Sequence, residues 1–160
     1  MDGKMKSKDL VKFKKSQWLK LGGKLATRIV EDADKGISQD GDGVKFPAYS
    51  TDYSLKKRIG KATPKGVSAS KQTNPPNLRL TGTMLNSLKV QKATTESVEI
   101  NYRDGEKVIG HSRKRGNKPK RNIYGLNNKN LQFVQDFIND NINDNIKKFN
   151  KKDIIIDVKI

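Results

Sequence analysis

The side chain best suited to acid–base chemistry in this sequence is His111, because it is the only histidine and the chain has no cysteine. A zinc site built from cysteine and histidine is therefore excluded, and Ser-His-Asp catalysis would have to use this one imidazole. No nucleophile or ligand set surrounds it in the sequence, so we expect a structural histidine, hydrogen-bonded near a predicted hairpin. The functional alternative is that His111 acts as a catalytic base or a pH switch.

Other signatures of enzymes are also missing from the chain. It contains no Walker loop, no glycine-rich dinucleotide motif and no HExxH helix. Asp40-Gly41-Asp42-Gly43 is not a calcium loop, because Val44 stands at a ligand position and no closing glutamate follows. We therefore expect no enzyme, no catalytic residue, no metal site and no cofactor, while a metal site made only of carboxylates stays open.

Positive charge is the most unusual feature of the composition. The chain has 34 Lys and Arg against 17 Asp and Glu, for a net charge of +17, which attracts DNA, RNA, anionic lipid or an acidic protein surface. The charge is densest in one predicted loop, which could contact DNA phosphates or a partner, or could be a solvated face. Its basic residues are Arg113, Lys114, Arg115, Lys118, Lys120 and Arg121. Since surface charges contribute little to stability, we expect neutralising all six to leave the fold intact.

Two further groups of residues have a functional and a structural interpretation. Thr81-Gly82 at a helix start could hold an anion, but capping and close packing at Gly82 is preferred. Trp18, Phe133 and Phe137 could stack on single-stranded bases. Their helical spacing favours packing in the core or between subunits.

Apolar spacing predicts two long helices. The first runs from Ser7, a plausible N-cap, to about Lys35, and Gly22-Gly23 inside it indicates a kink or, as the less favoured alternative, close packing. The second runs from Asn128 to about Phe149, capped by Asn127. Its stripe is Leu131, Val134, Ile138, Ile142, Ile146 and Phe149, of which Ile138 and Ile142 should be buried.

Strand patterns occur between and after these helices. Leu88–Lys92 and Val98–Tyr102 alternate and predict an antiparallel hairpin, preceded by a short helix capped by Thr81 that carries Met84 and Leu85. Residues 44–49 predict a short strand, 53–59 a helical turn and 63–76 an extended loop. The chain ends on a strand, Lys152–Ile160, in which Ile154, Ile156, Val158 and Ile160 alternate with Ile155, Asp157 and Lys159.

Together these patterns predict a single α+β domain over residues 1–160. A small antiparallel sheet is packed by two long helices, with long extended loops that include the segment 36–77. Hydrophobic and charged residues each make up 32% of the chain, so the core has little margin against chain entropy and partner chains should add stability. No stretch of about 20 apolar residues and no signal-peptide core is present, so we expect no membrane association and synthesis in a cytoplasm.

Three segments in order carry a family resemblance. They are Phe46–Lys56, Pro76–Leu88, and Val108–His111 followed by the basic loop and Arg121–Asn127. In this order they resemble the phage virion morphogenesis family, the tail-completion proteins, and the related small neck proteins. The residues that match its motifs are Leu80, Thr81, Gly82, Leu85, Ser87, His111, Arg121, Gly125 and Leu126. The chain departs from the family at Ser112-Arg113-Lys114 and in its C-terminal strand.

The resemblance implies a structural virion protein at the head–tail junction, which joins or closes the tail onto the capsid. Its implied partners are copies of itself in a ring, with a hexamer favoured over a dodecamer, other neck, portal-side or tail proteins, and the DNA backbone in the channel. The alternative function is a small basic DNA-binding protein, which lacks support from any helix-turn-helix, zinc-finger or RNA-recognition signature. A hydrolytic enzyme is a third and weaker hypothesis.

Overall fold

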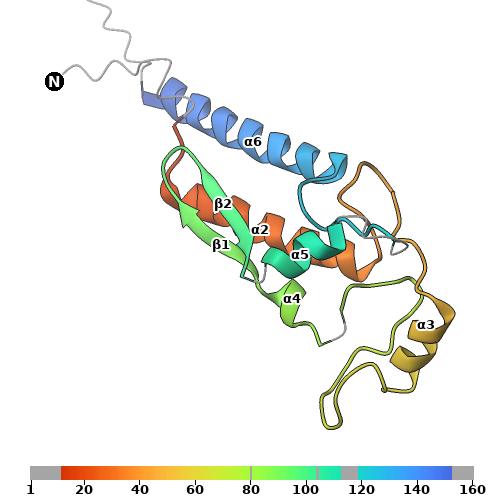
Figure 1. Cartoon of the computed structure of the whole chain (residues 1–160). Coiled ribbons are helices and arrows are strands. Elements are labelled where there is room, and N and C mark those ends of the chain that lie inside the picture. Colours follow the sequence, from red (N-terminus) through yellow and green to blue (C-terminus); the bar gives the residue numbers. More distant parts are fainter. Residues whose placement is uncertain (1–11, 80, 104, 113–118, 153–160) are drawn as a thin grey trace, which may run out of the picture.

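The computed structural model describes residues 12–79, 81–103, 105–112 and 119–152, with side chains up to Lys148 (Figure 1). The elements in chain order are helices α2 (Lys15–Asp34), α3 (Thr51–Arg58) and α4 (Thr83–Asn86), strands β1 (Leu88–Ala93) and β2 (Val98–Tyr102), and helices α5 (Gly105–Ser112) and α6 (Asn128–Lys152). Helices combined with a small antiparallel sheet confirm the predicted α+β class.

Helix α2 begins at Lys15, so the predicted start at Ser7 is wrong for residues 12–14, and Ser7 itself lies outside the described residues. The chain is extended at Lys14, and its main-chain N–H donates to Oε1 of Gln17 at 2.6 Å. This contact is the Gln17 half of a capping box and satisfies the main-chain donor of the N-cap residue. The helix ends at Asp34, and Gly36 adopts φ +71° where the chain turns.

Close packing, the alternative interpretation of the two glycines in α2, holds for Gly22. A Cβ atom on Gly22 would lie 2.6 Å from Cγ2 of Val98 and 2.8 Å from Cγ2 of Val90, so the missing side chain lets the sheet approach the helix. At Gly23 nothing lies within 4 Å of the same position. The helix continues through both glycines over its full length.

The predicted hairpin is confirmed. β1 and β2 pair antiparallel, with Leu88 opposite Tyr102 and an irregularity between Val90 and Lys92. The predicted strand over residues 44–49 is wrong, because this part of the chain makes only an isolated bridge between Ile37 and Lys45. Pro47 has no N–H to donate to a ladder, which limits strand formation here.

The core lies between α2, the sheet, α5 and the segment before α6. Its buried members are Leu25, Ala26, Ile29, Ala33, Phe46, Leu85, Leu88, Tyr102, Val108 and Ile123. Val108 is fully buried on α5, a helix that the sequence analysis did not predict.

The short helix α4 is capped by Gly82, with φ +83°, and not by Thr81, so that prediction is wrong by one residue. The predicted helical turn at 53–59 corresponds to α3.

Helix α6 packs antiparallel along α2 (Figure 1). Nε of Arg28 donates to Oδ1 of Asn130 at 3.0 Å, and Nε2 of Gln17 donates to Oδ1 of Asn141 farther along. Asn127 caps the helix as predicted, because its Oδ1 accepts from the N–H of Asn130 at 2.9 Å. The helix ends at Lys152, which the sequence assigned to the terminal strand; residues 153–160 lie outside the described part.

The prediction that Ile138 and Ile142 are buried is wrong, because both side chains are only half-buried. Helix α6 reaches the core through Phe133 and Val134, near its start. Among the described residues, its second half contacts the N-terminal half of α2 and the residues just before it, through Gln17 and Lys12. Ile146, in the same stripe, is 37% exposed.

Candidate functional site

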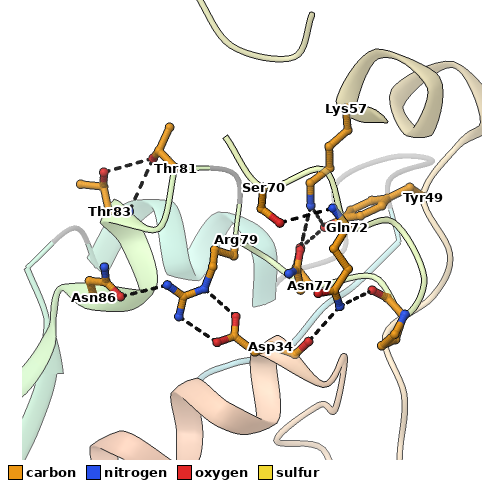
Figure 2. A network of polar contacts seen from close by, with 11 residues as sticks. Asp34, Tyr49, Lys57, Ser70, Gln72, Asn77, Arg79, Thr81, Thr83 and Asn86 are labelled. Carbon is orange, nitrogen blue, oxygen red and sulfur yellow. Dashed lines mark hydrogen bonds and ion pairs between the residues drawn. The ribbon is translucent and has the colours of Figure 1, made fainter. Parts of the chain in front are cut away.

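The three segments that carry the family resemblance meet around Tyr49. The Tyr49 hydroxyl donates to the carbonyl oxygen of Asn77, and Nζ of Lys57 donates to Oδ1 of Asn77 at 2.8 Å (Figure 2). The guanidinium of Arg121 donates to the carbonyl oxygens of Pro47, at 3.1 and 3.0 Å, and of Ala48, at 2.9 Å. We call the group Pro47, Tyr49, Lys57, Asn77 and Arg121 the Tyr49 junction.

Both cations of the junction also lie against the ring of Tyr49. The guanidinium carbon of Arg121 is 4.8 Å from the ring centre and Nζ of Lys57 is 4.9 Å from it. Such contacts are worth about 0.5–2 kcal/mol, more where water is excluded. Tyr53 packs edge-on to Tyr49, with ring centres 5.0 Å apart.

Helix α3 positions the lysine of the junction. Ser50 caps it, since its Oγ accepts from the N–H of Tyr53 at 3.4 Å, and Lys57 lies near its end, directed back toward Tyr49 (Figure 2). Lys57 is only 1% exposed, and its partners are the oxygens of Asn77 and Tyr49. Burial lowers the pKa of Lys57 to about 8 and raises the pKa of Tyr49 to about 12.

A second polar group lies beside the junction and fixes the end of α2. Arg79 makes a two-pronged ion pair with Asp34, at 2.7 and 2.8 Å, and its Nη1 donates to Oδ1 of Asn86 at 3.3 Å (Figure 2). Nε2 of Gln72 donates to the carbonyl oxygens of Asp34, at 3.2 Å, and Pro75, at 3.0 Å. These contacts attach the irregular segment before α4 to α2.

A third polar group holds the start of α6. Oδ2 of Asp32 accepts from Gln39 at 3.2 Å, Asn127 at 3.0 Å and Asn130 at 2.9 Å. Oε1 of Gln39 in turn accepts from the N–H of Asn127 at 3.1 Å. Gln39, Asn127 and Asn130 are almost completely buried, so these bonds satisfy groups that would otherwise be costly to bury.

The predicted basic loop is only partly described, because Arg113, Lys114, Arg115 and Lys118 lie outside the described residues. The last two members contact the protein itself. Lys120 is ion-paired with Asp40 at 3.0 Å, and Arg121 belongs to the Tyr49 junction. Arg121 therefore has a structural role, whereas the side chain of Lys120 is exposed.

The motif residues of the resemblance have mostly structural positions. Leu80 lies outside the described residues, Thr81 is exposed, and Leu85 is fully buried. Ser87 Oγ donates to the Met84 carbonyl at 2.7 Å. His111 is exposed on α5, and its carbonyl accepts from the N–H of Arg121 at 2.9 Å.

The remaining two motif residues precede α6 and border an apolar groove that sequence analysis did not find. Gly125 has φ +99°, and Leu126 packs against the core. The groove has a volume of about 460 Å³ and a mostly apolar lining from α2, β2, residues 123–126 and α6. Its α2 wall includes Trp18, whose Nε1 is buried with no acceptor among the described residues.

Within the described ranges, no group of three or more His, Asp or Glu residues could hold a metal ion. None of the helices in this part of the chain is long and apolar enough to cross a membrane. Comparisons with protein-family models, curated proteins and solved structures found no match.

Proposed function

We propose that this chain is a structural protein of the head–tail junction of a tailed phage, which assembles with copies of itself into a ring and joins or closes the tail onto the capsid. The observation that carries the proposal is the Tyr49 junction. Residues from Phe46–Lys56, Pro76–Leu88 and Arg121–Asn127 resemble one family in sequence order, and here they contact one another in space. The resemblance therefore covers a connected structural unit.

The chemistry of the junction supports a structural role over a catalytic one. Lys57 is 1% exposed, so a substrate has no route to its amine. Burial raises the pKa of both Tyr49 and Tyr53, which keeps the phenols protonated and poorly nucleophilic near neutral pH. These groups instead hold the long 36–77 segment against the segment before α6.

The 36–77 segment also supplies a surface for assembly. Its part around α3 projects away from the body formed by α2, the sheet and α6 (Figure 1). Four of its apolar side chains are strongly exposed: Val44 at 45%, Leu55 at 50%, Ile59 at 52% and Val67 at 45%. Leu55 and its C-cap neighbour Ile59 are four residues apart on α3 and so share one face, which favours contact with another protein chain.

The test is to measure the mass of the purified protein alone and mixed with portal-side or tail proteins by native mass spectrometry, and to image assembled particles carrying a tagged copy. The proposal expects a closed oligomer and a ring of density at the head–tail junction. A strictly monomeric chain that is absent from the junction of finished particles contradicts it.

The second candidate, a small DNA-binding protein, is favoured only by the net charge of +17. Its signature is binding of the chain alone to duplex DNA, with an affinity that falls steeply as salt rises. Tight binding of that kind, without any protein partner or particle association, would favour this function over the first.

A further inference from the structure

The outer edge of β2 is an open strand edge. In the antiparallel hairpin, the N–H of Arg103 donates to the carbonyl of Ser87 and that of Thr94 donates to Ser97, which fixes the alternation of paired residues. By this alternation the main-chain N–H and C=O groups of Glu99 and Asn101 point toward β1. Those of Val98, Ile100 and Tyr102 point away from β1, toward the outer edge. Among the described residues the sheet has only these two strands, so none of those residues pairs with the outer edge of β2.

The apolar groove runs along this same edge. Val98, Ile100 and Tyr102 line it from the sheet, Leu25 lines it from α2, and Val134 lines it from α6. The side chains of Val98, Ile100 and Tyr102 are on one face of the strand, the face that packs on α2. A strand added to β2 would therefore pair its main chain with the open edge and direct alternate side chains into the groove.

The chain itself contains a segment with the required pattern. Residues 153–160 follow α6 and read Asp-Ile-Ile-Ile-Asp-Val-Lys-Ile, so that Ile154, Ile156, Val158 and Ile160 share one face. Asp157 and Lys159 fall on the other face together with Ile155. One apolar and one largely polar face suit a strand whose inner side is covered and whose outer side meets water.

Length decides which copy supplies the segment. Lys152, where α6 ends, is 18 residues beyond Val134. At about 1.5 Å per residue, the helix carries the chain roughly 27 Å past that wall of the groove. The eight residues from 153 to 160 span at most about 29 Å when fully extended. The groove extends from Val134 to Trp18, beside Gln17, whose Nε2 donates to Oδ1 of Asn141. Asn141 is 11 residues before Lys152, so about 16 Å, or roughly five of the eight residues, is used in returning along α6 to this end of the groove. A chain's own segment therefore cannot place Ile154 and Ile156 along β2.

We propose that residues 153–160 of a second copy of this chain add as a strand to the outer edge of β2 and fill the apolar groove with Ile154, Ile156 and Val158. Each copy then offers one groove and one donor segment at different places on its surface. Such a head-to-tail contact closes into a ring when the rotation between copies permits. The ring itself rests on the proposed function, whereas the strand addition between two copies does not.

The test uses the full-length chain and two matched variants. Hydrogen exchange at the Ile100 amide is measured across a dilution series, together with mass by native mass spectrometry. We expect Ile100 to exchange on the order of tenfold more slowly in the oligomer, with the protection lost on dilution. Ile156→Asp should abolish both protection and association, and Ile155→Asp, the same change on the opposite face, should retain both.

A second measurement keeps the proposal testable if the Ile156→Asp chain does not fold. A free peptide of residues 153–160 should dissociate oligomers of the unmodified chain and protect Ile100, and a peptide carrying Ile156→Asp should do neither. Protection of Ile100 that is unchanged on dilution would overturn the proposal, because it indicates a chain's own segment. Oligomers in which Ile100 exchanges freely would also overturn it, while leaving the proposed ring function intact.

Discussion

The guanidinium of Arg121 stacks on the ring of Tyr49, with 4.8 Å between the guanidinium carbon and the ring centre, although 72 residues separate them in the chain. The same guanidinium donates hydrogen bonds to two carbonyls beside Tyr49. One side chain from the predicted basic loop therefore fastens the 36–77 segment to the body of the protein. This relationship changes what is expected of the loop's charges.

Replacing Arg121 with Gln should destabilise the fold by about 1–3 kcal/mol, because two carbonyls lose a charged donor and Tyr49 loses a cation. Urea denaturation measures the change. The matched control is Lys120→Gln, which breaks an exposed ion pair with Asp40 and should cost under about 1 kcal/mol. Equal effects of the two changes would show that the junction contributes no stability.

Neutralising the other basic residues of the loop should separate function from folding. With Arg113, Lys114, Arg115, Lys118 and Lys120 replaced by Gln and Arg121 retained, we expect a free energy of unfolding within about 1 kcal/mol of that of the parent. Attachment at the head–tail junction, measured by infectivity and by the fraction of particles carrying the protein, should fall. Unchanged infectivity would mean that the loop charges only interact with solvent.

Burial of Lys57 should make stability depend on pH. Its pKa is about 8 when folded and near 10.5 when unfolded, so between these values the unfolded chain binds more protons. The free energy of unfolding should therefore rise from about pH 8 to pH 10. Lys57→Met should lose this rise, and Lys56→Met, on the exposed side of α3, should keep it. Parallel pH profiles for all three proteins would contradict the assignment.

The two glycines of α2 should respond in opposite directions to alanine. Gly22→Ala places a Cβ 2.6 Å from Val98 and 2.8 Å from Val90, and the resulting overpacking should cost about 1–3 kcal/mol. Gly23→Ala meets nothing within 4 Å and should stabilise the protein by about 0.5–1 kcal/mol through helix propensity. Thermal unfolding of both variants checks the pair, and a stable Gly22→Ala protein would refute the close approach of the sheet.

Local pattern was sufficient to predict the hairpin and helix α6. Alternation over Leu88–Lys92 and Val98–Tyr102, and helical spacing after Asn127, can each be recognised from residues only a few positions apart. Pattern was insufficient where tertiary contacts compete with it. It placed the start of α2 at Ser7 because Leu10 and Phe13 extend the apolar spacing, and it missed α5, whose eight residues carry one fully buried side chain, Val108.

Composition and local patterns exclude cysteine chemistry, give the +17 charge, predict the α+β class and mark the three segments on which the proposed phage-neck resemblance rests. Packing in three dimensions is needed to see that these segments meet at Tyr49, that Arg121 is held there, and that no described residue pairs with the edge of β2 beside the apolar groove. Sequence patterns record which side chains avoid water. They do not record which distant surface covers each side chain, because that depends on how the helices and the sheet pack together.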